Sequence, residues 1–304
     1  MKYLKLMRPS HWTKNLFVFA ALVFGKKLLG ETDDVIYSLA STFGAFFCFC
    51  LASSAIYVFN DIVDVKADRM HPEKKSRPIA SGAITISAAV VLSLICAIVA
   101  MAASFLLVKS FGYIIAAYIL LMVLYSVLFK RMMILDCVVI SIGFCLRAVA
   151  GAVVLDVFIS PWLIICTFAL CLFLGFGKRR SEIEQLGDNK ELYRLTLADY
   201  SPELLAHMLS VTSGLAVVCF LLYTMDERTY RIFGTNNLVY TTPMALYCIF
   251  RFSALIQKGK FSGPVSLILG DIPFQISFFI WVVCCVGIIY ADKFANTFGN
   301  FWAY

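Results

Sequence analysis

The residues best suited to do chemistry lie between positions 60 and 82, in the segment NDIVDVKADRMHPEKKSRPIASG. Asp61, Asp64 and Asp68 occupy positions i, i+3 and i+7, so on a helix with about 100° per residue they share one face within about 60°. Carboxylates on one face repel one another unless a positive charge lies between them. A hard divalent cation such as Mg²⁺ takes carboxylate oxygens and substrate phosphates. The spacing therefore predicts a magnesium site formed by these three catalytic aspartates.

Basic residues of the kind that bind phosphate oxygens follow the acids directly. They are Arg69, His71, Lys74, Lys75 and Arg77. Acids for a metal beside bases for a phosphate indicate a metal-bridged, phosphorylated substrate, with Lys74 and Arg77 among its ligands. The alternative is a solvated loop whose charges only keep it in water. Against it, Asp61 and Asp64 follow the apolar run FFCFCLASSAIYVF, at a membrane depth where ionised groups are costly and usually functional.

The composition predicts the helices that must position this site. Of 304 residues, 61% are hydrophobic and 15% are charged, against about a quarter charged in a soluble domain. Runs long enough, or nearly so, for a hydrocarbon core of ~30 Å predict nine spanning helices. They cover 11–30, 36–60, 84–108, 111–129, 135–157, 160–177, 203–223, 239–257 and 273–291. We predict an all-α fold, a polytopic membrane protein whose nine transmembrane helices form a single domain over 1–304 with a cytoplasm-facing polar cavity.

The basic residues predict the orientation of these helices. With a cytoplasmic N-terminus, 18 of the 26 Lys and Arg residues fall on the cytoplasmic side and 6 on the other side, while Arg147 and Arg251 lie within helices. We expect a multi-pass protein of the inner or plasma membrane whose active site faces the cytoplasm. The net charge of +7 follows from this asymmetry and from anionic lipid, so we expect no nucleic-acid partner. The N-terminus lacks a signal-peptide layout, and we treat it as part of the mature chain.

Several other kinds of site are not indicated. The eleven cysteines are scattered through apolar segments without CxxC spacing, which is typical of small buried hydrophobic residues and not of disulfides or zinc sites. There is no Walker-type loop, no HExxH and no Ser/His/Asp grouping. His11, His71 and His207 are too dispersed to form a metal site.

The opening RPSHWTKN carries further polar residues at the start of an apolar run. Lys14 and Asn15 interrupt the first predicted span and are candidates to reach a cytoplasm-facing cavity and bind substrate. The alternative is an interfacial belt in which Arg8, Lys14 and Asn15 only flank Trp12.

A second polar cluster lies where the fourth helix returns to the cytoplasm, at YSVLFKRMMILD. Tyr125, Lys130 and Asp136 are the candidate substrate-binding residues. An interfacial belt aromatic and positive-inside anchors would account for Tyr125, Lys130 and Arg131, but not for Asp136, which is carried into the next apolar run.

Arg147 lies near mid-membrane in the fifth helix, in CVVISIGFCLRAVAGA. An unpaired guanidinium costs at least ~2.5 kcal/mol there, so the side chain should face the bundle interior and hold an anionic partner. Two partners are open: an acid of the bundle, in a structural ion pair, or a substrate phosphate. Small residues beside it, including Gly151, allow helices to pack closely.

The third cytoplasmic cluster follows the sixth helix, in a predicted loop of about 25 residues that begins GKRRSEIEQ. Lys178, Arg179 and Glu182 are the candidate substrate-binding residues. Since the three clusters follow the second, fourth and sixth helices on one membrane side, we expect them to converge on one cavity.

The segment from residue 60 resembles the UbiA-type intramembrane prenyltransferase superfamily, whose nine-helix bundles carry an Asn-Asp-x-x-Asp-x-x-x-Asp motif for Mg²⁺ and a diphosphate. Asn60, Asp61, Asp64 and Asp68 match this motif, and Asn60 is a further candidate substrate-binding residue. The usual second motif, Asp-x-x-x-Asp in the sixth–seventh loop, is replaced by GKRRSEIEQ, which argues against ordinary aromatic prenyl transfer. RPSHWTKN, HPEKKSRPIASG, YSVLFK…LD, GFCLRAVAGA and TTPMALYCIFRF are instead similar to the decaprenyl-phosphate phosphoribosyltransferase branch.

This resemblance implies a Mg²⁺-dependent pentosyltransferase. Its partners would be phosphoribosyl diphosphate from the cytoplasm and a polyprenyl (decaprenyl) phosphate from the bilayer, with diphosphate released. An acceptor phosphate is already a nucleophile at pH 7, so no general base is required. Where such enzymes act in arabinan cell-wall biosynthesis, the product feeds the lipid-linked arabinose donor.

Two other functions stay open at this point. One is a prenyltransferase that moves a polyprenyl group from its diphosphate to an aromatic or other small acceptor. The other is a transporter or lipid-binding protein, although the polar residues crowd one membrane side and leave no polar track across. Lipid chain length, the base that binds each phosphate, the number of metal ions, and whether the protein forms a homo-oligomer do not follow from the sequence.

Overall fold

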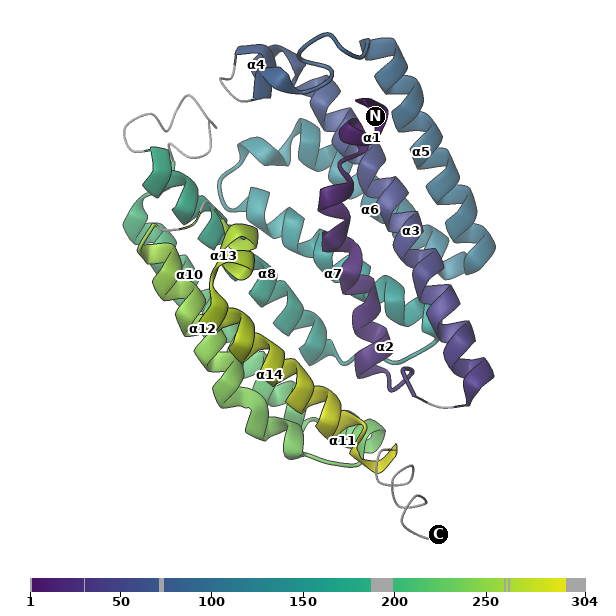
Figure 1. Cartoon of the computed structure of the whole chain (residues 1–304), viewed down its shortest axis with the longest axis vertical. Coiled ribbons are helices and arrows are strands. Elements are labelled where there is room, and N and C mark those ends of the chain that lie inside the picture. Colours follow the sequence, from purple (N-terminus) through teal and green to yellow (C-terminus); the bar gives the residue numbers. More distant parts are fainter. Residues whose placement is uncertain are drawn as a thin grey trace. The chain divides into compact units, whose positions relative to one another are not determined.

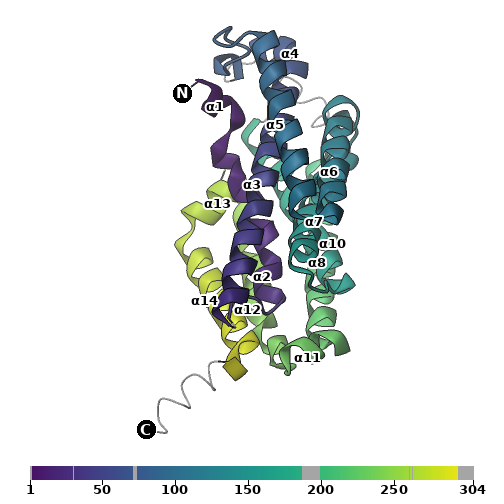
Figure 2. The same ribbon diagram turned by 90° about the vertical axis from the view of Figure 1, so that its right-hand side faces the viewer.

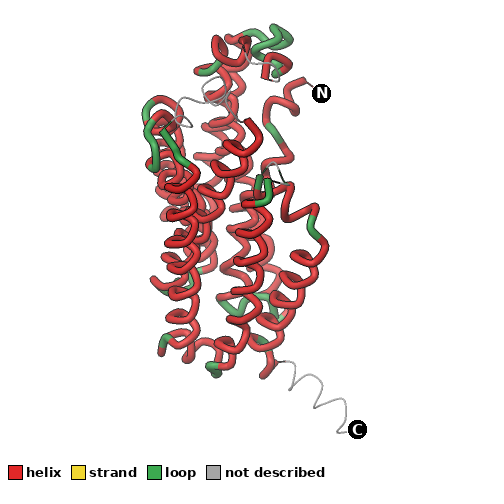
Figure 3. The backbone as a smooth tube through the Cα atoms, turned by 90° about the vertical axis from the view of Figure 1, so that its left-hand side faces the viewer, coloured by secondary structure: helices red, strands yellow, loops and turns green. Residues whose placement is uncertain are grey.

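The computed structural model is built from helices joined by short turns. It describes residues 2–29, 31–70, 74–186, 199–259, 261 and 263–293. These residues contain no strand, as Figure 3 shows. The all-α prediction is confirmed. His71, a predicted member of the basic run, lies outside the described residues.

Contacts divide the chain into two compact units. The first unit comprises Met1–Ala21, Tyr37–Val157 and Glu191–Asp199. The second comprises Leu22–Ile36, Phe158–Lys190 and Tyr200–Tyr304. A single domain over 1–304 stays a prediction.

The helices of the first unit run from the N-terminus to the middle of the chain (Figure 1). They are α1 Lys2–Met7, η1 Pro9–Phe19, most of α3 Thr32–Val63, α4 Val65–Met70, η2 Lys74–Ser76, α5 Ile86–Leu107, α6 Lys109–Val127, η3 Phe129–Arg131 and α7 Leu135–Leu155. In Figures 1 and 2, α5 lies along α6, to which it is joined by a sharp turn at Val108.

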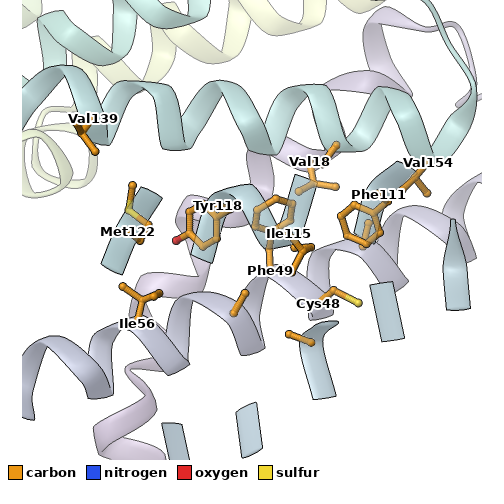
Figure 4. Packing of buried hydrophobic residues seen from close by; sticks show 14 residues of the cluster. Val18, Cys48, Phe49, Ile56, Phe111, Ile115, Tyr118, Met122, Val139 and Val154 are labelled. Atoms are coloured by element: carbon orange, nitrogen blue, oxygen red, sulfur yellow. The ribbon is translucent and has the colours of Figure 1, made fainter. Parts of the chain in front are cut away.

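The core of the first unit is formed by one apolar cluster shared among η1, α3, α5, α6 and α7. Figure 4 shows Phe49 of α3 among Phe111, Ile115 and Tyr118 of α6, with Val18 of η1 close by. The rings of Phe49 and Tyr118 meet edge to face at 5.3 Å, a favourable aromatic geometry. This cluster fixes α3, which carries the acidic motif, relative to the N-terminal segment and α7.

The second unit contains the later helices and its own cores. Its main elements are α2 Ala20–Phe24, α8 Pro161–Leu186, α10 Pro202–Met225, α11 Glu227–Phe233, η6 Asn237–Thr241, α12 Thr242–Gln257, α13 Pro264–Gly270 and α14 Ile272–Ile289. Tyr223, Phe233 and Tyr290 belong to one buried cluster. The hydroxyl of Tyr290 donates to the carbonyl oxygen of Leu22 at 3.1 Å and accepts from the amide of Leu28 at 3.1 Å, which anchors the 22–29 segment.

Eight of the predicted spans are confirmed as helices long and apolar enough to cross a membrane, counted among the described residues. The first predicted span, 11–30, has a different structure. It begins as an unusually long 3₁₀ helix, η1, and continues as the five-residue α2. Pro9 removes a backbone donor at its start, and Asn15 lies buried at its centre and bonds to neighbouring helices. Nine spans stay a prediction.

The third polar cluster, which begins at Lys178, is helical where a loop was predicted. Helix α8 continues to Leu186, past the predicted end at residue 177, so Lys178–Glu184 lie on its last turns. Lys178 and Arg180 pair with Glu182 and Glu184 at i,i+4 spacing. These pairs and the high helix propensity of Lys, Arg, Glu and Gln favour continuation of the helix.

Candidate active site

The acidic motif lies where α3 passes into α4. Asp61 is buried on the last turn of α3, Asp64 occupies the turn between the helices, and Asp68 is buried on α4. The helical bond pattern continues through this junction, because the amide of Asp64 donates to the carbonyl of Asn60 at 2.9 Å and that of Asp68 to the carbonyl of Asp64 at 2.8 Å. The predicted helical register of the three aspartates is therefore kept.

Each of the three carboxylates is bound by a basic side chain from another segment. Arg77 Nη1 lies 3.1 Å from Asp61 Oδ1 and 2.7 Å from Asp68 Oδ2, so one guanidinium bridges two carboxylates of the motif. Asp64 forms an ion pair with Lys130. Asp61 Oδ1 also receives Arg8 Nη2 at 2.5 Å. Charge-assisted bonds of this kind are among the strongest in proteins, and here they hold the repelling acids together.

A compact turn presents Arg77 to the acids. The Arg77 amide donates to the carbonyl of Lys74 at 2.9 Å in η2, and Ile79 is buried against Leu6 and Val58. Gly82 ends the turn with φ 78°, a conformation that favours glycine. The 74–85 segment is therefore a folded element of the site and not only a solvated linker.

The N-terminal segment lies antiparallel to one polar face of α3. From Asn15 back to Arg8, its contacts move along α3 from Cys50 to Asp61. Asn15 Nδ2 donates to Cys50 Sγ and Ser53 Oγ, each at 3.3 Å. Trp12 Nε1 donates to Ser54 Oγ at 3.1 Å. His11 and Arg8 contact the Tyr57 ring, with Arg8 Cζ 5.3 Å from the ring centroid. The residues of α3 in this series recur at helical spacing, so the series forms one continuous contact surface leading to Asp61.

Arg147 is buried in α7 with 5% of its surface exposed, as predicted. Its partners are neutral, however. Nε donates to Asn15 Oδ1 at 2.8 Å, Nη1 to the Gly143 carbonyl at 2.7 Å and Nη2 to the Tyr118 hydroxyl at 2.8 Å. No carboxylate among the described residues forms an ion pair with it, so the structure does not show an acid of the bundle, one of the two partners left open by the sequence. Aromatic faces surround its charge, with Cζ 4.7 Å from the Tyr118 centroid and 5.2 Å from that of Phe144.

The second polar cluster is partly assembled around the motif. Lys130 of η3 reaches Asp64, and Tyr125 is half-buried against the core of the first unit. Asp136 is fully buried in the first turn of α7, where the helix dipole favours a carboxylate. Lys14 is half-buried on η1, and Lys74 is half-buried on η2. Of these residues, Lys130 is the one whose bond to the acidic motif the structure shows directly.

The third cluster belongs to the second unit. Arg179 is buried and lies 2.5 Å from Glu182, which also faces Lys178 at 3.7 Å. Arg180 lies 2.7 Å from Glu184. The bases here are paired with acids of their own helix. Convergence of this cluster with the other two stays a prediction.

The oxygen atoms of the motif fit a hard divalent cation. Asn60 Oδ1 is buried and has no hydrogen-bond partner in the part of the chain described, and Asn60 precedes Asp61 directly. Over the same residues, no group of three or more His, Cys, Asp or Glu side chains is arranged to hold a metal ion. Mg²⁺ commonly takes one or two carboxylates and fills its remaining positions with water and substrate phosphates, so this set of oxygens suits it.

Two contributors to the site were not among the predicted site residues. From the sequence, Arg8 is expected only among interfacial residues, yet in the structure Arg8 bonds to Asp61. Its backbone is in the left-handed region, at φ 53° and ψ 62°, which is uncommon for a residue other than glycine and marks a constrained position. Tyr118, in the apolar run of α6, supplies the hydroxyl acceptor for Arg147. The signal available in the sequence for Arg8 was its position near the start of an apolar run. No local pattern in the sequence marks Tyr118.

Comparisons with known proteins show which proteins this chain is similar to. The sequence profile described as the UbiA prenyltransferase family matches residues 16–198. A decaprenyl-phosphate phosphoribosyltransferase of Mycolicibacterium smegmatis is 30% identical over 292 residues, covering 92% of this chain and 89% of that protein. The Corynebacterium glutamicum protein of the same name is 30% identical over 293 residues, covering 94% and 86%.

Solved structures show the same fold. A UbiA homolog from Archaeoglobus fulgidus, bound to DMAPP and Mg²⁺, superposes with a TM-score of 0.71 at 17% identity, over 95% of this chain and 99% of that one. Since the family profile covers more than half of the chain and relatives at 30% identity cover most of it, this protein belongs to the UbiA prenyltransferase family.

Proposed function

We propose that this protein transfers 5-phosphoribose from phosphoribosyl diphosphate to a polyprenyl phosphate and releases diphosphate. The observation that carries the proposal is the arrangement around α3 and α4, where three motif carboxylates lie against Arg8, Arg77 and Lys130. Full-length similarity to two decaprenyl-phosphate phosphoribosyltransferases supports this choice among the transfers that such a site can perform.

Asp61, Asp64 and Asp68, together with Asn60, are the candidate metal ligands, of which Mg²⁺ commonly takes one or two carboxylates. A Mg²⁺ ion bound there would supply positive charge to the leaving diphosphate. Arg8, Arg77 and Lys130 already lie within bonding distance of the carboxylates. They are therefore placed to bind phosphate oxygens of a donor that approaches the same acids, where charge-assisted bonds are strong.

The bonds that change need no general base from the protein. An oxygen of the acceptor phosphate attacks the anomeric carbon of the donor, and the bond from that carbon to the diphosphate oxygen breaks. A phosphate monoester is largely ionised at pH 7 because its second pKa is about 6, so it carries the required electron pair. The work of the protein is to position two anions and to stabilise the charge on the leaving group.

Two anionic substrates need basic ligands in addition to the acids of the motif. Lys14, Lys74 and Tyr125 of the first unit are the remaining proposed ligands there. Lys178, Arg179 and Glu182 are proposed from the sequence as further substrate ligands. The proposed setting is the cell membrane, with the site open to the cytoplasm, where the soluble donor is found.

The test uses purified protein in detergent with Mg²⁺, a polyprenyl phosphate and phosphoribosyl diphosphate labelled in the ribose. Label should enter the organic phase, and both a chelator and Asp64→Ala should abolish the transfer. Asp34→Asn, at the exposed start of α3, is the matched control and should keep full activity. Absence of label, together with prenyl transfer from a polyprenyl diphosphate to an aromatic acceptor, would replace this proposal with the prenyltransferase alternative.

A further inference from the structure

Arg147 is the most enclosed cation among the described residues of the first unit, and its surroundings set limits on its role. The guanidinium uses Nε, Nη1 and Nη2, each in a bond of 2.7–2.8 Å to a protein oxygen. The aromatic rings of Phe49, Tyr118 and Phe144 lie within 5.6 Å of Cζ. Three of the five N–H donors of Arg147 are therefore already bonded within the protein.

The three acceptors belong to three different elements. Asn15 lies on η1, Tyr118 on α6 and Gly143 on α7 itself. A planar guanidinium can serve divergent acceptors at once because its donors form a rigid fork, which an ammonium group cannot reproduce. Arg147 therefore ties the N-terminal 3₁₀ helix to α6 and α7 at a single point.

Asn15 passes this attachment on to α3. Its side chain is fully buried; Oδ1 accepts from Arg147, while Nδ2 donates to Cys50 and Ser53. The bond from Arg147 thereby fixes which way the amide faces, with its donor turned toward α3. Three residues further along η1, Gly151 of α7 packs directly on the Val18 backbone. The 3₁₀ helix is held between α3 and α7.

The same segment carries Arg8 toward the acidic motif. Trp12 binds Ser54, whose hydroxyl donates to the carbonyl of Met7 at 2.9 Å, and the next residue is Arg8. Ser54 and Asp61 stand seven positions apart on α3, two turns along the same face. The alignment of the N-terminal segment along α3 that is set at Asn15 therefore extends to the contact between Arg8 and Asp61.

We propose that Arg147 is a positioning residue: by holding Asn15 it fixes the N-terminal 3₁₀ helix along α3, so that Arg8 meets Asp61. This inference rests on the proposed function for its kinetic consequence. It changes the expected role of Arg147 from a phosphate ligand to a support for the site. The geometry of the support can be tested without any assumption about the substrate.

The experiment compares Arg147→Met, Arg147→Lys, Asn15→Leu and the double variant Arg147→Met/Asn15→Leu. Arg231→Met, which removes an exposed arginine of α11, is the matched control. Hydrogen–deuterium exchange of the peptide spanning 9–19 reports the attachment of η1. Steady-state kinetics of label transfer give kcat, and KM for donor and acceptor separately.

We expect Arg147→Met to raise exchange in 9–19 and to lower kcat by about 10-fold or more, with acceptor KM changed less than about threefold. Arg147→Lys should behave similarly, since an ammonium group does not reproduce the planar fork of donors that reaches these three acceptors. The double variant should lose no more than the worse single variant, because both residues act through one contact. Should Arg147→Met not fold, Asn15→Leu carries the same prediction alone.

Unchanged exchange in 9–19 together with a tenfold rise in donor or acceptor KM would overturn the proposal and make Arg147 a substrate ligand. Wild-type activity in Arg147→Lys would also contradict it. So would a loss of kcat in the double variant that equals the product of the losses in the two single variants. If the wild-type protein transfers no phosphoribose, the proposed function fails. Exchange in 9–19 then still decides whether Arg147 holds the N-terminal segment.

Discussion

Arg8 Nη2 lies 2.5 Å from Asp61 Oδ1, although 53 positions separate the two residues. The contact joins the N-terminal segment to the end of α3. Arg8 keeps a left-handed backbone to make it, and Arg77 approaches the same carboxylate oxygen from the 74–85 turn. Arg77 also bonds to Asp68, and Lys130 pairs with Asp64, so three basic side chains balance the three carboxylates of the motif.

Asp61→Asn should lower kcat/KM for transfer by at least about 100-fold, or ~2.7 kcal/mol in transition-state stabilisation. The amide keeps the shape of the side chain but removes the negative charge that attracts Arg8, Arg77 and the proposed metal ion. The measurement is label transfer as a function of Mg²⁺ concentration. Asp34→Asn on the same helix is the control, and full Mg²⁺-dependent activity in Asp61→Asn would contradict the metal assignment.

Arg8→Met should lower kcat/KM by about 10-fold, less than the loss expected for Asp61→Asn, because Arg77 still binds Asp61. Lys5→Met removes a nearby exposed cation of α1 and should leave activity unchanged. The comparison is made from initial rates at low donor concentration. Equal rates for Arg8→Met and the wild-type protein would show that the contact with Asp61 does not contribute to the reaction.

Gly151→Ala should destabilise the protein by about 1–3 kcal/mol, since an added Cβ would overlap the carbonyl oxygen of Val18 in the backbone of η1. Gly214→Ala provides the opposite case. A Cβ there meets nothing within 4 Å, so the gain in helix propensity should stabilise α10 by up to ~1 kcal/mol. Thermal unfolding in detergent measures both. A stable Gly151→Ala protein would mean that η1 does not pack on α7 as closely as described.

The pair between Lys26 and Asp292 should give a small, pH-dependent stabilisation of the second unit. The Lys26 ammonium, 2.8 Å away, lowers the pKa of the Asp292 carboxyl below its usual value. Because the folded pKa lies below the unfolded value of about 3.9, the stabilisation is fully present above that pH and is lost as pH falls through the folded pKa.

The measurement is Tm of the wild-type protein, Asp292→Asn and Lys26→Met at pH 6 and pH 3. The variants should unfold slightly below the wild-type protein at pH 6, and the difference for Asp292→Asn should become smaller at pH 3. The effect is small because the Asp292 side chain is 59% exposed and solvent screens the pair. A difference for Asp292→Asn that persists unchanged at pH 3 would exclude titration of this carboxylate as its cause.

Local patterns in the sequence determined much of the fold and the acidic half of the site. Apolar runs of sufficient length predicted eight helices that the structure contains, because the hydrocarbon core imposes both length and composition on each. The helical period alone placed Asp61, Asp64 and Asp68 in one register, and the backbone bonds through Asp64 confirm it. These features depend on neighbours within a few residues, which a single sequence displays directly.

The tertiary structure alone decided which bases meet the acids. The partners of the motif come from 53, 16 and 66 positions away, at Arg8, Arg77 and Lys130. No local period relates them, because their meeting depends on how η1, the 74–85 turn and η3 pack around α3. The sequence could show that Arg147 must be buried and bonded, since an exposed cation in lipid is costly. Only the packing of η1, α6 and α7 shows that its partners are an amide, a hydroxyl and a backbone carbonyl.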